Sequence, residues 1–421
     1  MKFARLPTSS VPDRHRARPQ MSFMMVAALA AALGLAVASG PADADDGFQS
    51  CVVGLKARAR EDGISARTID GVLAQVNHLP RIIELDRSQP EFTTTFADYF
   101  NRRVTNERVR RGRALVREHR DLLERIQRDT GVPPHYLVSF WGLETNFGSY
   151  FGTVPTPDAL ATLACDERRS AYFTTELMAA LQIIDAGDIT ADQMKGSWAG
   201  ALGHVQFMPS VFLRYAVDGD GDGRRDLWNS IPDAMASAGN FLEQLGWQSG
   251  QRWGREVRLP EDFDYNLIGR QQKHSLSHWR SLGVTDAFGE TLPDVDLPAS
   301  LLVPAGHRGP AFLVYENFNI IMRWNRSEYY ALTVGRLADQ IAGAGRLQQP
   351  PPDDAPRFSR DQLMEIQSHL NELGYDAGEA DGILGPATRA AVSRFQQTVG
   401  MIPDGHLDQA VVDALDEAVS G

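Results

Sequence analysis

Residues 141–148 read Trp-Gly-Leu-Glu-Thr-Asn-Phe-Gly and close an apolar segment that starts after Pro133 and Pro134. Proline suits the first turn of a helix, where its missing N–H would have no partner in any case, so we expect a helix from about Pro134. Counting back from Glu144 by three, four and seven residues gives the positions that share its helix face, namely Trp141, Phe140 and Leu137. The sequence therefore predicts a helix that carries one acid on an apolar stripe.

Glu144 has three interpretations at this point. Burial disfavours the charged form, so an unpaired carboxyl on the stripe would have a raised pKa and would suit a general acid working near neutral pH. It would otherwise be a structural acid paired with an arginine, or a solvated residue at a frayed helix end, since charged residues usually lie outside or are paired. Gly148 and Gly152 follow, and we expect them to end the helix and open the backbone beside the acid.

The overall composition is that of a globular protein with several domains. A chain of 421 residues is long enough for two or three domains, and 43% hydrophobic residues is a normal share for building cores. The formal charge of -12 argues against nucleic acid as a partner, because phosphate binding needs a basic face.

Residues 1–46 have the layout of a secretory signal. Three arginines (Arg14, Arg16 and Arg18) precede the apolar run 23–37, and small residues follow at 36–38 and 42–44 as two candidate cleavage points. The run is short for a span that stays in the membrane, and an uncleaved anchor is the alternative. We therefore expect an exported chain.

Cys51 and Cys165 are the two cysteines of the chain. In an exported protein two cysteines can pair, so we predict a disulfide between them. The alternative is two buried free thiols.

Residues 47–345 contain helix-like segments separated by glycine, proline and aspartate clusters, without a long linker. One large, mainly α-helical domain is the simplest interpretation. Within it, the segment 91–115 carries four aromatic residues followed by many arginines, which predicts a pair of amphipathic helices with a solvated charged face. The segment 253–296 mixes short apolar runs with turn residues, and short strands are expected there.

Residues 197–210 read Ser-Trp-Ala-Gly-Ala-Leu-Gly-His-Val-Gln-Phe-Met-Pro-Ser and are rich in small residues. Such residues allow a ligand or another helix to approach the backbone closely. Ser197 and Gln206 are hydrogen-bonding groups among apolar or small neighbours, so the segment is either part of a binding site or a tight helix crossing. Arg168 and Arg169 are adjacent in the chain, and on a helix at most one of them would reach a given ligand.

The loop that begins at Asp218 follows the EF-hand pattern of calcium sites. Acidic residues stand at its positions 1, 3, 5 and 9, and glycine stands at position 6. Asn229 replaces the glutamate expected at position 12, so Asp233 is the better closing carboxylate. We expect a structural calcium site of modest affinity, and the alternative is a solvated turn. The candidate ligands are Asp218, Asp220, Asp222, Asp233 and, at position 7, Arg224.

Residues 346–356 are rich in proline and mark the clearest domain boundary. Consecutive prolines hold an extended, semi-rigid spacer without a core of its own. Beyond it, residues 357–421 contain two related halves, each with an Asp-Gly turn that leads into a helix, at Asp381 and at Asp404. We expect a compact helical module there.

Taken together, these motifs resemble the B family of lytic murein transglycosylases, followed by a peptidoglycan-binding domain of the three-helix type. The resemblance runs from about residue 47 to the C-terminus and is carried by residues 141–148, 197–210 with the acidic loop, 323–330 and 381–396. It implies a mainly α fold: a lysozyme-like catalytic domain over 47–345 with some short strands, and a small three-helix domain over 357–421.

The resemblance also implies roles for single residues. The catalytic acid falls on Glu144, and the family's calcium loop falls on residues 218–226. The substrate-binding positions fall on Ser197, Gln206, Asn325, Tyr330, Arg168, Arg169, Trp324 and Phe241. The last two stand where the family often has tyrosine, which keeps an aromatic surface but changes the hydroxyl contacts.

The implied reaction is non-hydrolytic cleavage of the bond between N-acetylmuramic acid and N-acetylglucosamine in peptidoglycan, which leaves a 1,6-anhydro sugar. The matched motifs supply no second carboxylate, so one acid would act with the substrate's own acetamido group, without a cofactor. Two alternatives remain: a hydrolytic muramidase on the same scaffold, and a non-catalytic wall-binding scaffold protein. The implied setting is a periplasmic monomer that acts on glycan strands, with cell-wall or division proteins as further partners.

Overall fold

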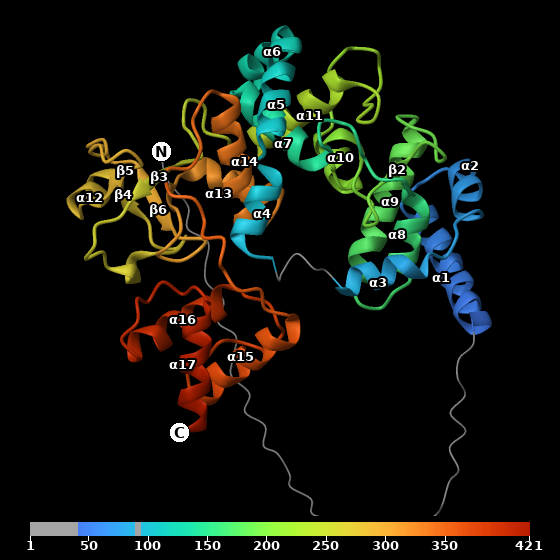
Figure 1. The fold of residues 1–421 in the computed structure, drawn as a ribbon. Helices are drawn as coiled ribbons and strands as arrows, with labels where there is room; N and C mark the ends of the chain where they lie inside the picture. The colour runs from blue at the N-terminus through green and yellow to red at the C-terminus, as the bar shows by residue number, and fades with distance from the viewer. Residues whose placement is uncertain (1–40, 89–93) are drawn as a thin grey trace, which may run out of the picture. The chain divides into compact units, whose positions relative to one another are not determined.

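A computed structural model describes residues 41–88 and 94–421, so the leader expected over 1–46 lies almost wholly outside the described residues. Residues 45–421 form one compact unit. Among the described residues, no helix combines the length and the apolar character needed to cross a membrane. Figure 1 shows that helices dominate this part of the chain.

The large domain is mainly α-helical, as the sequence predicts. Its helices are α1 (Pro41–Glu61), α2 (Ala66–Thr68), α3 (Pro80–Ser88), α4 (Phe96–Arg103), α5 (Asn106–Glu118), α6 (Arg120–Thr130), α7 (Pro134–Thr145), α8 (Thr156–Ala164), α9 (Ser170–Ala186), α10 (Pro209–Tyr215), α11 (Ile231–Gln244), α12 (Leu276–Ser281), α13 (Glu316–Trp324) and α14 (Glu328–Ile341). Single helical turns lie at Ile69–Leu73, Gly203–Val205 and Tyr265–Leu267.

Helix α7 begins at Pro134, as expected, and buries the face below Glu144. Trp141 is 2% exposed, and Phe140 and Leu137 are fully buried. The helix ends at Thr145, because Asn146 and Phe147 adopt left-handed φ angles of 50° and 61°. The expectation that Gly148 ends the helix is therefore wrong by three residues. Asparagine tolerates this conformation, whereas phenylalanine adopts it rarely.

The predicted amphipathic pair over 91–115 corresponds to α4 and α5, with residues 91–93 outside the described part of the chain. Each helix starts with a threonine cap. The Thr95 hydroxyl accepts from the Asp98 N–H, and the Thr105 hydroxyl accepts from the Arg108 N–H. Such caps satisfy N–H groups that have no partner within the helix.

A five-stranded antiparallel sheet lies in the same domain. It consists of β3 (Gly254–Arg258), β4 (His274–Ser275), β5 (Thr285–Asp286), β6 (Pro298–Leu302) and β7 (Ala311–Val314), in the order β4-β6-β7-β3-β5. The expected segment 253–296 missed β6 and β7. Both are almost entirely buried, and a strand buried on both faces has a continuous apolar run without the alternation that marks a strand in sequence.

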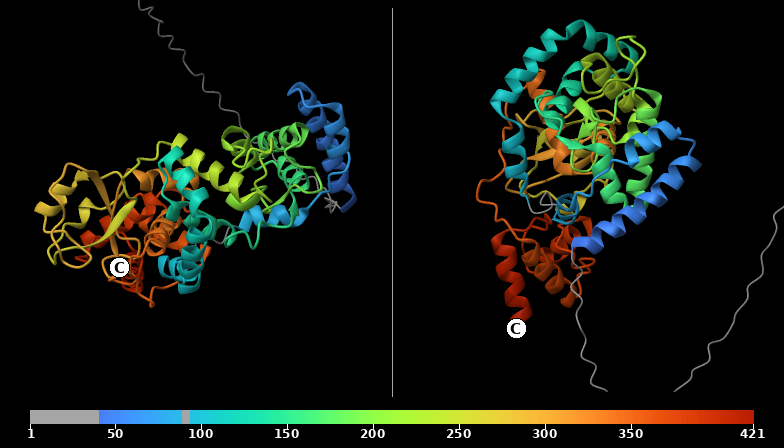
Figure 2. Two further views of the ribbon diagram at one scale, coloured as in Figure 1. Left: turned by 90° about the horizontal axis from the view of Figure 1, so that it is seen from above. Right: turned by 90° about the vertical axis from the view of Figure 1, so that its right-hand side faces the viewer.

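A second, two-stranded sheet pairs β1 (Val154–Pro155) with β2 (Lys195–Gly196). The five-stranded sheet and the α8–α9 pair lie at opposite ends of the large domain in Figure 1 and in the left view of Figure 2. A disulfide joins Cys51 in α1 to Cys165 at the end of α8, with the two Cα atoms 5.9 Å apart.

The proline-rich segment 346–356 contains neither helix nor strand. Its start is held against the large domain, because the Glu256 carboxylate accepts the backbone N–H groups of Gln348 and Gln349 at 2.8 and 2.9 Å. Beyond it, α15 (Arg360–Glu372), α16 (Pro386–Thr398) and α17 (Gln409–Ser420) pack around their own apolar core. This is the predicted three-helix module.

Candidate active site

Glu144 lies in the last turn of α7, where two donors from the end of the large domain reach its carboxylate. The Trp324 indole N–H at the end of α13 donates to Glu144 Oε1 at 3.0 Å. The Tyr330 hydroxyl in the first turn of α14 donates to the same oxygen. Glu144 Oε2 has no hydrogen-bond partner among the described residues.

The balance of these contacts favours the protonated acid. Burial raises the pKa of Glu144 to about 7, although the hydrogen bonds from Tyr330 and Trp324 act in the opposite direction. Indole is a donor only, and burial together with the neighbouring Glu144 raises the pKa of the Tyr330 phenol, so that it keeps its own proton. Since Oε1 already accepts two donors, the proton of the acid belongs on Oε2. Glu144 is thus held by one oxygen and carries its proton on the other.

Aromatic side chains surround the Trp324 indole. Phe140 stacks on it with ring centroids 4.3 Å apart, and Phe241 and Phe207 lie at 5.2 and 5.4 Å. Phe241 is 7% exposed, whereas Trp324 is half-buried. This packing fixes the indole plane and with it the direction of the N–H that holds Glu144.

Two glycines bring the end of α7 against the segment 196–206. A Cβ on Gly148 would lie 2.3 Å from the His204 ring, and a Cβ on Gly152 would lie 2.0 Å from the Gly196 carbonyl oxygen. Both glycines also have positive φ angles, of 77° and 91°. These positions accept only glycine, and they place Ser197 and Gln206 beside the loop that follows Glu144.

His204 is a buried anchor beneath this contact. Its Nδ1 accepts the Trp141 indole N–H at 2.9 Å, and its carbonyl accepts the Thr145 hydroxyl at 3.1 Å. Burial lowers the pKa of His204 to about 4, so the ring is neutral and can accept this bond. The two contacts fix the last turn of α7 and therefore the backbone of Glu144.

Ser197 and Gln206 each retain one kind of hydrogen-bonding capacity. The Ser197 hydroxyl oxygen accepts the N–H groups of Ala201 and Ala199 at 3.0 and 3.3 Å, so its own proton is left to donate. The Gln206 amide donates to the carbonyls of Gly203 and Phe151 at 2.9 and 3.2 Å, so its oxygen is left to accept. Gln206 holds this orientation from a left-handed backbone, with φ of 50°.

Asn325 follows α13 directly and is exposed. Its side-chain oxygen accepts the Ser327 N–H at 3.0 Å, which leaves the amide group as a donor. It lies one residue from Trp324, and so the structure brings Asn325, Trp324 and Tyr330 together at the α13–α14 junction.

Arg168 and Arg169 lie in the turn between α8 and α9 and not on a helix, so both reach one group. They contact opposite oxygens of the buried Asp86 carboxylate, at 2.7 and 3.1 Å. The helical spacing on which the expectation for a ligand rested is therefore absent at these two residues. Both guanidinium groups remain partly exposed, at 46% and 38%.

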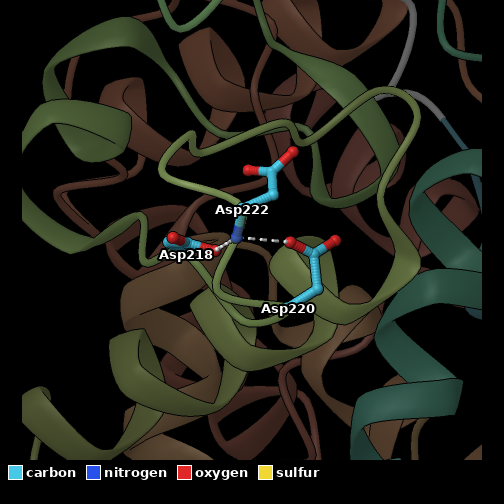
Figure 3. Close-up of side chains that lie close together, drawn as sticks. All are labelled: Asp218, Asp220 and Asp222. Carbon is cyan, nitrogen blue, oxygen red and sulfur yellow. Dashed lines mark hydrogen bonds between the residues drawn. The ribbon is translucent and has the colours of Figure 1, made fainter.

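The acidic loop gathers Asp218, Asp220 and Asp222, whose nearest oxygens all lie within 4.8 Å of one another (Figure 3). Hydrogen bonds from the backbone N–H groups of Gly223 and its neighbours lower the pKa of Asp218, which keeps it a carboxylate. Three exposed carboxylates at this spacing fit a hard divalent cation such as calcium.

Asp233 lies outside that cluster. Its Oδ1 accepts the Gly219 N–H at 2.8 Å, and its Oδ2 accepts the Asp226 N–H at 2.7 Å. At 1% exposure it ties the two ends of the loop to α11. Arg224 contributes its N–H to Asp222 Oδ1 at 2.9 Å.

The large domain also matches known proteins. The family model described as transglycosylase SLT domain matches residues 47–339. The chain belongs to the transglycosylase SLT family. A second model, of a peptidoglycan binding domain, matches residues 359–415 of this transglycosylase.

Individual relatives agree with this assignment. Membrane-bound lytic murein transglycosylase B of Escherichia coli is 30% identical over 295 residues, which cover 66% of this chain and 79% of that protein. The crystal structure of SltB3 from Pseudomonas aeruginosa in complex with NAG-anhNAM-pentapeptide is similar with a TM-score of 0.85 and 42% identity, covering 88% of this chain and 99% of that one. The Escherichia coli lytic transglycosylase Slt35 in complex with calcium is similar with a TM-score of 0.60 and 29% identity, covering 73% and 94%.

Two features of the transglycosylase site were missed by sequence reasoning. Tyr330 and Trp324 were expected to contact sugars, whereas the structure places their donors on Glu144. His204 was not singled out at all. Spacing could not reveal the first two contacts, which span 186 and 180 residues. For His204 the sequence did contain a signal. Gly203 directly precedes it, and Gly148, which lies against its ring, follows Glu144 by four residues.

Proposed function

We propose that this transglycosylase cleaves the bond between N-acetylmuramic acid and N-acetylglucosamine in peptidoglycan with Glu144 as its single acid and base. The observation that carries the proposal is a withdrawn carboxyl group with a pKa of about 7, held through one oxygen by two neutral donors. Glycosidases that use two carboxylates hold them at a defined separation on either side of the glycosidic bond. Among the described residues, Glu144 has no carboxylate partner in its hydrogen-bond set.

The reaction begins with Glu144 as the acid. Its Oε2 proton passes to the glycosidic oxygen, and the bond from that oxygen to the anomeric carbon of the muramic residue breaks. The acetamido carbonyl of the same sugar stabilises the positive charge that develops, as in substrate-assisted glycosidases. Glu144 is then a carboxylate and takes the proton of the C6 hydroxyl as that oxygen bonds to the anomeric carbon. The 1,6-anhydro product forms, and Glu144 ends protonated again.

The hydrogen-bonding groups that neighbouring side chains leave unused match the groups of this substrate. The free hydroxyl proton of Ser197 suits the acetamido carbonyl, and the free oxygen of Gln206 suits a sugar hydroxyl or amide N–H. Asn325 offers donors at the α13–α14 junction, and the half-buried Trp324 offers an aromatic surface, whereas Phe241 is buried and supports that indole by packing on it. Arg168 and Arg169 remain partly exposed and suit carboxylates of the stem peptide.

The acidic loop is proposed as a structural calcium site. Asp218, Asp220 and Asp222 would hold the ion, and Asp233 would fix the loop that carries them. A bound calcium ion would contribute positive charge that offsets the mutual repulsion of these carboxylates. The chemistry at Glu144 needs no cofactor.

The cellular setting follows from the substrate and the leader. An exported chain in the periplasm would meet peptidoglycan there, retained on it by residues 357–421. Cell-wall or division proteins are proposed as further partners, and the enzyme is proposed to act as a monomer.

The muropeptides released from purified sacculi test the reaction. Mass spectrometry should find products that end in 1,6-anhydro-muramic acid, each one water lighter than the reducing form. Products with reducing ends would assign a hydrolytic muramidase on this scaffold. The absence of any release would leave a wall-binding protein.

A further inference from the structure

The two halves of the C-terminal domain repeat one hydrogen-bond arrangement atom for atom. In the first half, Gln367 Nε2 donates to Asp381 Oδ1 at 3.1 Å, and the Ile383 N–H donates to the same oxygen at 2.8 Å. In the second half, Gln396 Nε2 donates to Asp404 Oδ1 at 2.8 Å, and the His406 N–H follows at 2.9 Å. The Asp carboxylates of the two halves are therefore equivalent positions.

The arrangement around each Asp-Gly turn confirms the equivalence. The N–H groups of Gly382 and Gly405 donate to the side-chain oxygens of Gln367 and Gln396, at 2.7 and 2.8 Å. A Cβ on Gly382 would lie 2.7 Å from the Arg360 carbonyl oxygen, and a Cβ on Gly405 would lie 2.8 Å from the Arg389 carbonyl oxygen. Each arginine stands seven residues before its glutamine.

The second half uses this arrangement to hold a loop of the large domain. Asp404 Oδ2 accepts the His307 backbone N–H at 2.8 Å, and His307 Nδ1 lies 2.6 Å from the same oxygen. Gly306 permits this close approach, since a Cβ there would lie 2.8 Å from Asp404 Oδ2. Arg389 completes the contact by donating to the Tyr329 hydroxyl at 3.0 Å. A polypeptide backbone is thus the partner of this carboxylate oxygen.

The first half offers the same groups without an occupant. Among the described residues, Asp381 Oδ2 has no hydrogen-bond partner, and Asp381 is half-buried. The Arg360 guanidinium contacts only the Asp381 carbonyl, at 3.0 Å, and forms no ion pair within the described part of the chain. Met364 lies beside Gly382 and is 37% exposed, an apolar surface next to the charged pair.

We infer that Asp381 Oδ2 and Arg360 form a binding site for a peptide, with the stem peptide of peptidoglycan as its ligand. Asp381 would accept an amide N–H or an ammonium group, as Asp404 accepts the N–H of His307. Arg360 would bind a free carboxylate of the same peptide, the anion that guanidinium matches in geometry. The site rests on the proposed function of the chain as a peptidoglycan enzyme and specifies which part of the wall its C-terminal domain recognises.

The chemistry of the two groups favours peptide over glycan. Stem peptides combine amide N–H groups, ammonium groups and free carboxylates, so a carboxylate and a guanidinium side by side complement both of their charges. Glycan strands that carry their stem peptides are neutral, because each lactyl carboxyl group is joined to the peptide as an amide. The charges of Asp381 and Arg360 would therefore have no complementary charges on the sugar.

Asp381→Asn in the full chain tests the inference. Asparagine retains a side-chain oxygen for the bonds from Gln367 and Ile383 and replaces the free acceptor by a donor. Binding of a free stem pentapeptide, measured by calorimetry, should weaken at least about tenfold, the change that loss of one charge-assisted hydrogen bond produces. Glu379→Gln is the matched control, because this exposed carboxylate two residues away forms no side-chain hydrogen bond with any residue that the structure describes. The control should bind the peptide as the parent chain does.

Two further measurements make the result decisive. Chitin oligosaccharides, which are neutral and lack both the peptide and the lactyl group, should bind the parent chain and Asp381→Asn equally, and both chains should unfold at the same temperature. Equal peptide binding by Asp381→Asn and the parent, or no peptide binding by the parent, would overturn the inference.

Arg360→Gln should weaken binding of the peptide acid more than of its C-terminal amide, and equal weakening of both would overturn the role given to Arg360. Release of anhydro-muropeptides is measured separately and decides the proposed reaction whatever the peptide result.

Discussion

Glu144 in the large domain is half-buried and Asp404 in the C-terminal domain is 6% exposed, and their pKa values are shifted in opposite directions. At Glu144, burial outweighs two hydrogen bonds to one oxygen and raises the pKa to about 7. At Asp404, burial also acts to raise the pKa, but hydrogen bonds from His307, His406 and Gln396 outweigh it and lower the pKa. The number of donors on the carboxylate decides the difference.

The contrast separates a reactive acid from a structural one. Asp404 uses both oxygens, so its charge is stabilised and it serves as a permanent anion at a contact. Glu144 uses one oxygen and leaves the other for a proton, so it changes charge near neutral pH. A buried carboxyl group with incomplete hydrogen bonding is thus the feature that marks the catalytic site.

The largest expected effect comes from removing the proton of Glu144. Glu144→Gln retains the oxygen that accepts from Trp324 and Tyr330 but has no acidic proton, so turnover of peptidoglycan should fall about a thousandfold, within the range for loss of a general acid. Glycan binding should remain measurable. The release of soluble muropeptides gives the rate, and a variant that keeps most of the parent rate would refute the role of Glu144.

A smaller effect should follow from removing one donor to Glu144. Hydrogen bonds to the charged form lower a pKa, so Trp324→Phe or Tyr330→Phe should raise the pKa of Glu144 by about one unit. The limb of the kcat/KM profile that falls with rising pH should move to higher pH by that amount. Trp324→Tyr is the control, because it retains a donor. An unmoved limb in both phenylalanine variants would show that neither donor tunes the acid.

Asp404→Asn should change stability and leave turnover of short soluble glycans almost unchanged. The variant loses a charged acceptor for His307, which should lower the free energy of unfolding by about 1–3 kcal/mol. Since the folded pKa of Asp404 is lowered, its contribution is present above the ordinary aspartate value and is lost as the pH falls through the folded pKa. Denaturant unfolding at pH 7 and at pH 3 should therefore show a smaller difference from the parent at the lower pH, and an equal difference at both would contradict this.

A further effect on stability, of the opposite sign, is expected at Glu144. The folded pKa of about 7 lies above the ordinary value of 4.5, so stability present below pH 4.5 is lost as the pH rises through 7. Glu144→Gln cannot ionise and avoids this loss. Its Tm should exceed that of the parent by about 2–4 °C at pH 8 and match it near pH 4.5. A parent chain that is as stable as the variant at pH 8 would argue against a raised pKa.

Local features of the fold could be predicted from the sequence. Helix α7 and its buried stripe follow from the spacing of apolar residues below Glu144, and the two cysteines predict the observed pairing of Cys51 with Cys165. The Asp-Gly turns at 381 and 404 predicted the two related halves of the C-terminal domain. Each of these signals lies within a few residues or rests on a count.

The contacts that tune the acid could not be predicted, because they join distant segments. Trp324 and Tyr330 are adjacent to Glu144 only after α13 and α14 pack on α7, and nothing in their local sequence specifies an acid as the partner. The same holds for Asp86 between Arg168 and Arg169, and for Asp404 against His307. Residue types can indicate which groups bear chemistry, whereas the protonation state depends on tertiary packing.

The pKa of Glu144 can be measured directly by titration of its own carboxyl carbon. Carbon-13 NMR of chain labelled at the glutamate carboxyl carbons, compared with Glu144→Gln to assign the resonance, gives the midpoint without any contribution from substrate. We predict that one carboxyl resonance titrates near pH 7 and is absent from the variant. A midpoint near 4.5 would contradict the account, because Glu144 would then be ionised at neutral pH and could not deliver the first proton.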